Sequence, residues 1–186
     1  MKKRIITITG LPGSGKSSTA KGVAAALGYE HFSSGDLFRK MAADRGLSIE
    51  EINFAAEKQK AIDHEVDNYL AKIGNEKNDM VIDSRMAFHW IPDSFKIFLD
   101  LDLRTAAGRT FEHIQSEGRA SQAGSSADEV YENTVKRLES EKKRYAALYK
   151  IDFTDKSQFD LVVDTGKNDL AATINIIVEA YNKWSI

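Results

Sequence analysis

Cysteine is absent from this chain of 186 residues, and neither sign of charge dominates it. Without cysteine, a disulfide framework and a thiolate metal site are both excluded, and an oxidising compartment gains no support. The 26 lysines and arginines are balanced by 28 aspartates and glutamates, which leaves a formal net charge of −2. Because that balance gives no general attraction for polyanions, nucleic acid is not an expected partner.

Long hydrophobic runs are also missing, and no segment approaches the length needed to cross a bilayer. The basic start at residues 1–4 leads into an apolar stretch that is too short for a secretory signal. No metal-ligand spacing is found among the four histidines, which are His31, His64, His89 and His113. We therefore expect a cytoplasmic protein with no membrane partner.

The length and the hydrophobic fraction of 42% are typical of one well-buried domain. No repeat, low-complexity tract or interdomain linker interrupts the chain. We expect a single domain over residues 1–186 and a monomeric protein.

Apolar, β-prone segments alternate with helical patterns along the chain. The expected strands are residues 5–8, 30–32, 80–82, 96–99 and 161–163. Strands that alternate with helices indicate a parallel sheet covered on both faces. The fold class predicted is therefore α/β, a three-layer α/β/α domain with a five-stranded parallel sheet.

Capping residues mark the expected helix boundaries. Ser48 and Glu51 have capping-box spacing, and an imperfect helical stripe continues from them up to Gly74. The Ser-, Gly- and Ala-rich stretch 118–126 is interpreted as a loop. The remaining helices are expected from the loop before Lys16 to Leu27, from Ser34 to near Gly46, from Asp102 to about Glu117, from Ser125 and Asp128 to about Lys150, and from Asp169 to Lys183.

The segment Gly10-Leu11-Pro12-Gly13-Ser14-Gly15-Lys16-Ser17 has the spacing of a phosphate-binding loop. It also has the required setting, since a strand pattern precedes it and a helical pattern continues through Ser18. Its glycines allow consecutive N–H groups to face phosphate oxygens at the positive end of the following helix. Lys16 is expected to reach the β- and γ-phosphates, and Ser17 to place its hydroxyl on Mg²⁺. The sequence therefore predicts a nucleotide-handling protein with its nucleotide site at residues 10–18.

Polar residues follow two other expected strands, at the sheet edge where open parallel sheets bind ligands. Asp83 is predicted to hold Mg²⁺ through a water, and Arg85 to clamp a second phosphate. Their alternative role is that of a capping group and a paired charge. After the second strand, Ser34 can cap a helix from which Arg39 projects toward the cleft, unless that arginine is merely solvated.

The long charged helix expected before Lys150 carries Arg137 and Arg144, seven residues apart and so on one face. Both could reach a transferring phosphoryl group if this part of the chain closes as a lid. Arg119, in the loop before that helix, is a weaker candidate. Such mixed charge also suits a solvated helix face, so both readings stay open.

Taken together, these motifs resemble the nucleoside monophosphate kinases, and more narrowly the small archaeal-type cytidylate kinases. The resemblance covers nearly the whole chain. It rests on the phosphate-binding loop and on residues 34–42, 45–51, 62–67, 83–85, 139–145, 148–152 and 159–165.

The resemblance implies transfer of the γ-phosphoryl group of ATP to CMP or dCMP, with Mg²⁺ and a closing lid. It assigns acceptor binding to a helical region at about 34–74 and the lid to about 110–145. The roles it implies are acceptor-phosphate binding by Arg39 and Arg85, contact with the transferred group by Arg137 and Arg144, and contact with the adenine of ATP by Arg109. A monophosphate acceptor is already ionised, so such an enzyme needs no general base.

The sequence departs from the family pattern where the acceptor base would be framed. Residues 68–70 are Asn-Tyr-Leu, where the family tends to carry two arginines and a glutamine, and Met86 stands where some bacterial relatives use an aspartate. Asp63 and Asp67 share a helix face and could accept a hydrogen bond from the amino group of cytosine, or could face solvent.

Two other functions are weighed beside the nucleotide kinase. A kinase acting on a sugar or alcohol would need a carboxylate to accept a hydroxyl proton, and Asp36 is the candidate. A regulatory module would bind ATP or GTP without transferring phosphate. A GTPase-type switch gains little support, because Lys167-Asn168-Asp169 reverses the order of the guanine-reading motif.

Overall fold

The computed structural model describes residues 3–116 and 126–186. Its centre is a five-stranded parallel sheet, formed by β1 (Ile5–Gly10), β2 (Glu30–Ser33), β3 (Met80–Asp83), β4 (Phe95–Asp100) and β5 (Leu161–Asp164). The strand order is β2-β3-β1-β4-β5. The strands β2 and β3 lie on one side of β1, and β4 and β5 lie on the other. The carboxyl end of β1 therefore lies where the connections diverge to opposite sides, which is the point where ligands bind in such folds. The predicted sheet is confirmed.

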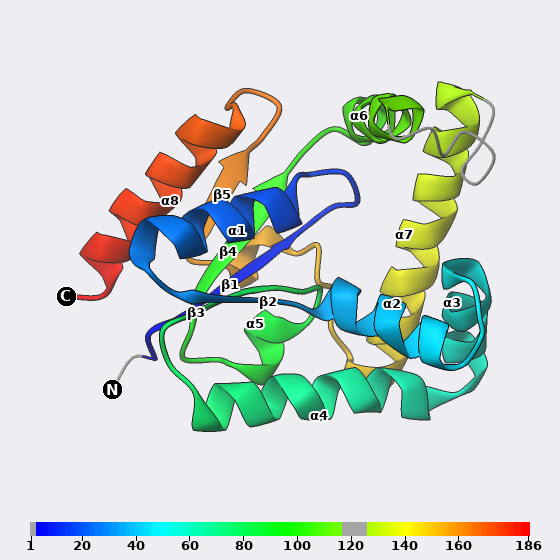
Figure 1. Ribbon diagram of the computed structural model, residues 1–186, viewed down its shortest axis with the longest axis horizontal. Coiled ribbons are helices and arrows are strands. Elements are labelled where there is room, and N and C mark those ends of the chain that lie inside the picture. The colour runs from blue at the N-terminus through cyan, green and yellow to red at the C-terminus, as the bar shows by residue number, and fades with distance from the viewer. Residues whose placement is uncertain (1–2, 117–125) are drawn as a thin grey trace.

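Alternate residues of β1 supply the cores on the two faces of the sheet. Ile6 and Ile8 pack with α1 (Lys16–Leu27) and α8 (Leu170–Trp184), and Ile5 packs on the opposite face with α4 (Lys60–Glu76) and α5 (Ala87–Trp90). Figure 1 shows α1 and α8 on one side of the strands and α4 on the other. A strand buried on both faces explains the unbroken apolar run that starts β1.

Two smaller cores extend the molecule beyond the sheet. One joins α2 (Ser34–Asp44), α3 (Ile49–Lys58) and the first turns of α4. The other places Leu138 of α7 (Ala127–Tyr149) against Phe98 of β4 and Phe153. The long α7 helix also packs beside α6 (Leu103–Ser116), and Figure 1 shows it running past the sheet edge from α6 down to α4. One helix thereby borders both halves of the ligand-binding edge.

The stripe from Ile49 to Gly74 does not form one continuous helix. The backbone leaves the helical conformation at Gln59, with φ −121° and ψ 89°, which separates α3 from α4. The turn allows Ile52 of α3 and Ile62 of α4 to enter the same small core. The capping box of Ser48 is present as expected.

Most of the other caps agree with the sequence. Asp102 accepts from the N–H of Thr105 and Asp169 from that of Ala172. The cap of α7 is Ser126, which accepts from the N–H of Glu129 at 3.2 Å, while the expected Ser125 lies outside the described residues, as does Arg119. The short helix α5 and the 3₁₀ turn at Lys156–Gln158 were not predicted. Across the two described segments, no helix is long and apolar enough to span a membrane.

Candidate active site

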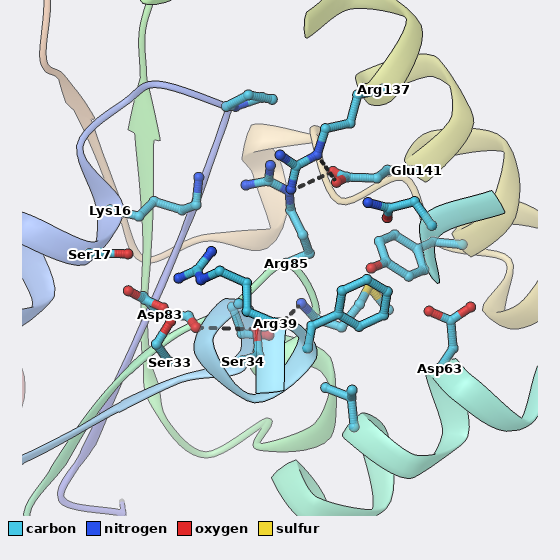
Figure 2. Close-up of a pocket in the computed structure, with 18 of the residues that line it drawn as sticks. Lys16, Ser17, Ser33, Ser34, Arg39, Asp63, Asp83, Arg85, Arg137 and Glu141 are labelled. Atoms are coloured by element: carbon cyan, nitrogen blue, oxygen red, sulfur yellow. Dashed lines mark hydrogen bonds and ion pairs between the residues drawn. The ribbon is translucent and has the colours of Figure 1, made fainter. Parts of the chain in front are cut away.

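A cleft of about 430 Å³ opens at the carboxyl ends of β1, β2 and β3, bordered by α2, α4 and α7. It brings together most of the predicted site residues, which are Pro12, Gly13, Lys16, Ser17, Ser34, Arg39, Asp63, Asp67, Asp83, Arg85, Arg137 and Arg144. Figure 2 shows Ser17 and Asp83 at one end of the cleft and Asp63 at the other.

A second cavity of about 290 Å³ lies on the other side of the phosphate-binding loop. It contains the predicted residues Ser14, Gly15, Ser18 and Arg109, together with Thr165 and residues at the start of α8. The guanidinium of Arg109 donates to the carbonyl oxygen of Thr165 at 2.9 Å, which fixes the arginine at the wall of this cavity. The loop therefore separates two cavities, as a site for two substrates requires.

The phosphate-binding loop connects β1 to the first turn of α1, as predicted. Its lysine, Lys16, folds back so that Nζ donates to the carbonyl oxygen of Leu11 at 2.8 Å. Burial, reinforced by the nearby charge of Arg85, lowers the pKa of Lys16 well below its ordinary value. A cation with so little solvation of its own is ready to exchange its contacts for phosphate oxygens.

Gly13 adopts a positive φ of 74°, and its position is also closed to a larger residue by α6. A Cβ atom there would lie 2.7 Å from the carbonyl oxygen of Ala106. The glycine therefore lets the loop bend and lets α6 approach it closely.

Asp83, at the end of β3, is buried, and its Oδ2 atom has no hydrogen-bond partner. That oxygen lies 3.6 Å from Nε2 of the His31 imidazole. A carboxylate that lines the same cleft as the hydroxyl of Ser17 is the kind of hard oxygen donor that suits Mg²⁺. No cluster of three or more metal-binding side chains occurs within residues 3–116 and 126–186, so a metal here would need phosphate oxygens and waters as further ligands.

Arg85 is fixed in the cleft by contacts from two elements, β1 and α7. Its Nη1 donates to the carbonyl oxygen of Gly10 at 2.6 Å, and its Nε donates to Glu141 of α7 at 2.7 Å. The turn that carries it is held by Thr9, whose hydroxyl donates to the carbonyl oxygen of Ser84 at 2.9 Å. The side chain of Arg85 is only 12% exposed, and its ion pair with Glu141 agrees with the paired-charge alternative.

Glu141 is a site residue that the sequence analysis missed. Besides Arg85 it binds Arg137, whose Nε donates to Oε1 at 2.9 Å. Burial alone would raise the pKa of Glu141, but the charges and hydrogen bonds of Arg85 and Arg137 outweigh burial and lower it to about 2. The only indication in the sequence is the four-residue spacing from Arg137, which Glu141 shares with many pairs on solvated helices.

Further along α7, Arg144 forms a buried ion pair with Asp63 of α4, with Nε to Oδ2 at 3.1 Å. Burial raises the pKa of Asp63 to about 6, against the opposing charge of Arg144 and with a smaller contribution from Asp67. The solvated-face alternative is therefore wrong for Arg144 and Asp63. Arg39, by contrast, is more than half exposed and pairs with Asp36 one turn earlier on α2.

Asp67 is buried as well, and both of its oxygens already accept hydrogen bonds. Trp90 donates to Oδ1 from Nε1 at 2.9 Å, and the hydroxyl of Tyr149 donates to Oδ2. These contacts join α4 to α5 and to the end of α7. Burial raises the pKa of Asp67, while the two hydrogen bonds oppose the rise.

Ser34 and Ser33 divide their roles at the start of α2. Ser33 is the cap, accepting from the N–H of Asp36 at 3.2 Å, and Ser34 donates to the carbonyl oxygen of Asp83 at 3.3 Å. Both line the cleft, so the N-terminus of α2 faces the space where an anion could bind.

Comparison with known proteins places this geometry in a family. A family model described as an AAA domain matches residues 9–136. A cytidylate kinase of Haloarcula marismortui is 36% identical over 184 residues, covering 97% of this chain and 91% of that protein. A cytidylate kinase of Methanothrix thermoacetophila is 37% identical over 179 residues, covering 95% and 96%. The chain belongs to the cytidylate kinase family.

Solved structures confirm the fold of this cytidylate kinase family member. Shikimate kinase from Bacteroides thetaiotaomicron superposes with a TM-score of 0.64 at 15% identity, over 96% of this chain and 98% of that one. Shikimate kinase from Aquifex aeolicus gives 0.62 at 15% identity, over 98% of both chains. These structures share the kinase-like α/β/α architecture.

The positions that depart from the family pattern lie differently with respect to the cleft. Asn68 and Tyr69 are exposed on α4, and the ring of Tyr69 packs against Phe32. Leu70 and Met86 are buried and line the cleft. Within this member of the cytidylate kinase family, the departures at 70 and 86 are therefore the ones that reach the cleft.

Proposed function

We propose that this protein transfers the γ-phosphoryl group of ATP to CMP or dCMP. The observation that carries the proposal is the convergence of Lys16, Arg85 and Arg137 in the cleft beside the phosphate-binding loop, with a second cavity on the other side of that loop. The family membership supports a monophosphate acceptor. Three cationic side chains in one cleft also suit a reaction between two phosphorylated substrates, because they neutralise the negative charge of both.

On the donor side, ATP would lay its phosphates along the loop and its adenine in the second cavity against Arg109. Ser17 and Asp83 would hold Mg²⁺, since the Asp83 oxygen without a hydrogen-bond partner lies in the same cleft as the Ser17 hydroxyl. When bound, the ion would neutralise the negative charge that develops on the phosphate oxygens.

On the acceptor side, Arg39 and Arg85 would bind the monophosphate, and the base would extend toward Asp63. An ionised Asp63 accepts a hydrogen bond from the exocyclic amino group of cytosine, which uracil lacks. Asp67 is assigned to the same base region, where its proposed contact with the base would add to the two hydrogen bonds that it accepts from the protein. The apolar part of the pocket comes from Leu70 and Met86.

During transfer, an oxygen of the acceptor phosphate attacks the γ-phosphorus, and the bond to the β–γ bridging oxygen breaks to release ADP. The attacking oxygen carries no proton to remove, so positioning and charge neutralisation suffice. Arg137 is proposed to contact the transferred group from α7. Arg144 shares that proposed role, and its guanidinium would first exchange its pairing with Asp63 for the phosphoryl oxygens.

The experiment is a measurement of ADP formation from ATP and Mg²⁺ with CMP, dCMP, UMP, AMP, GMP, shikimate or gluconate as acceptor. We expect strong stimulation by CMP and dCMP. Stimulation by shikimate or gluconate would instead support the alcohol kinase, with Asp36 as the base to test. Nucleotide binding without stimulation by any acceptor would overturn the kinase proposal in favour of a regulatory module.

A monomer in the cytoplasm belongs to the same proposal. Light scattering on the purified protein is expected to give the mass of one chain. A larger particle would contradict this part.

A further inference from the structure

Two arginines of the cleft, carried by different elements, bind one buried carboxylate. Arg85 lies in the turn that follows β3, and Arg137 lies on α7. Glu141 accepts from Arg85 through Oε2 at 2.7 Å and from Arg137 through Oε1 at 2.9 Å. Figure 2 shows both guanidinium groups beside this carboxylate and directed toward the space near Lys16.

The atoms used in these contacts leave the phosphate-binding ends of the arginines available. Glu141 takes the Nε hydrogen of each guanidinium. The terminal amino groups of Arg137 make no hydrogen bond within the described segments, and of those of Arg85 only Nη1 does, to Gly10. A carboxylate that competed with substrate would instead occupy the forked terminal groups, which match phosphate oxygens.

The two guanidinium groups also need a counter-charge to stay together. Arg85 and Arg137 both lower the pKa of Lys16 through their charges, so the three cations repel one another across the cleft. Glu141 is 4% exposed and carries a pKa near 2, so its negative charge is fixed throughout the neutral range. Arg137 itself is half exposed, and across residues 3–116 and 126–186 its guanidinium makes no hydrogen bond other than that with Glu141, so it depends on Glu141 for its orientation.

We propose that Glu141 is a positioning residue for phosphoryl transfer, holding Arg85 and Arg137 side by side so that their free ends meet the acceptor phosphate and the transferred group. The inference rests on the proposed kinase function and extends it, since Glu141 itself contacts neither phosphate. Glu141 also links α7 to the end of β3, so that Arg137 of α7 is held beside Arg85.

The test is Glu141→Gln, a change that keeps the shape of the side chain but removes the charge. The amide can accept from one arginine and presents its NH₂ group to the other, so one guanidinium is released. We expect kcat with CMP to fall about a hundredfold, the size of loss that follows misplacement of a reacting group, while KM for ATP changes only a few-fold. Glu139→Gln, the same change on the exposed face of α7 two residues earlier, is the matched control and is expected to retain wild-type kinetics.

A double-variant cycle separates positioning from general stability. In an Arg137→Ala background, Glu141→Gln has only Arg85 left to disturb, so its effect on kcat is expected to shrink well below a hundredfold. An equal factor in both backgrounds, or wild-type kcat in Glu141→Gln, would overturn the inference. If Glu141→Gln does not fold, Glu141→Asp enters the same cycle, because it keeps the charge but reaches only one arginine. A wild-type protein without CMP kinase activity would instead refute the proposed function, so the two failures are distinguishable.

Discussion

At the scale of single residues, Asp63 is the side chain whose charge changes in the range where enzymes are assayed. Burial raises its pKa to about 6 in spite of Arg144. Below that pH it is protonated, and as the pH rises through about 6 it becomes the carboxylate that accepts from the cytosine amino group. We expect kcat/KM for CMP to rise from about pH 5 to about pH 7 and then to level off.

The control for this prediction is Asp63→Asn, because the phosphate monoester of CMP titrates in the same range. The variant keeps the titration of the substrate but loses that of residue 63. Its profile is expected to be flatter than that of the wild type, and its preference for CMP over UMP weaker. Superimposable profiles would show that Asp63 does not read the base in its ionised form.

Lys16 supports a simpler prediction. Lys16→Ala removes the cation that lies on the phosphate-binding loop, and activity with CMP is expected to fall by about a thousandfold, at the upper end for loss of one stabilising group. Thermal unfolding should change little, because among the described residues Lys16 donates a hydrogen bond to Leu11 alone, within the loop. Lys21→Ala, on the exposed side of α1, is the matched control and should retain full activity.

The residues show which parts of the site a sequence can reveal. Lys16 and Ser17 were predicted because a contiguous motif, read between a strand and a helix, defines their geometry locally. Glu141 was not predicted, because the sequence of this mixed-charge helix does not distinguish it from Glu139. Only the packing of α7 near the end of β3 brings Glu141, and not Glu139, to Arg85. The pairing of Arg144 with Asp63 escaped notice for the same reason, since it depends on the contact of two helices that lie far apart in the chain.

At the scale of elements, two glycines with nearly equal backbone angles separate conformational strain from steric contact. Gly28 ends α1 at φ 67° with open space around it, and Gly13 has φ 74° with the backbone of α6 against it. Gly28→Ala is expected to lower the free energy of unfolding by about 1 kcal/mol and to leave kcat unchanged. Gly13→Ala should cost more, because a Cβ meets the Ala106 carbonyl, and should also impair ATP binding.

Urea unfolding and ATP titration of both glycine variants measure these effects. Equal losses of stability would contradict the proposed close approach of α6 to the loop.

The joint between α7 and α4 gives a prediction about stability. Tyr149→Phe removes the hydroxyl that donates to Asp67 and leaves a buried carboxylate oxygen without that partner. We expect a loss of about 1–3 kcal/mol in the free energy of unfolding, the cost of an unsatisfied buried group. Tyr131→Phe, at the other end of α7, keeps the ring that lies against Arg104 and should be close to neutral. If both variants had the same stability, the Tyr149 contact would contribute nothing to the joint.

Elements were predicted well where the periodicity is local and less well where packing decides. The strands follow from their apolar runs, and those of β1 and β3 are buried on both faces. The break at Gln59 does not, because the stripe from Ile49 to Gly74 continues on either side of it. Only the small core shared by α2, α3 and α4 requires the chain to turn there.

At the scale of the whole molecule, the arrangement of the sheet accounts for most of the function. Crossovers on both sides of β1 put the phosphate-binding loop, the Asp83–Arg85 turn and the N-terminus of α2 at one edge. This convergence was predictable, because a parallel sheet always gathers the carboxyl ends of its strands. The contacts that α7 makes with that edge were not predictable, because no short motif encodes the angle at which α7 crosses the sheet edge or its distance from that edge.

The chain has two tryptophans, and the fold separates them. Trp184 packs on the α8 side of the sheet, whereas the indole of Trp90 is tied to Asp67 at the acceptor side, on the opposite face. Indole fluorescence shifts with local polarity and hydrogen bonding, so a Trp184→Phe protein would report from the acceptor side alone. Titration with CMP is expected to change its emission, and titration with ATP to change it much less. If CMP left the emission unchanged, the cytosine base would not bind near Asp67. The indole of Trp90 would thus serve as an intrinsic fluorescent probe that follows occupancy of the proposed acceptor pocket in real time, without an added label.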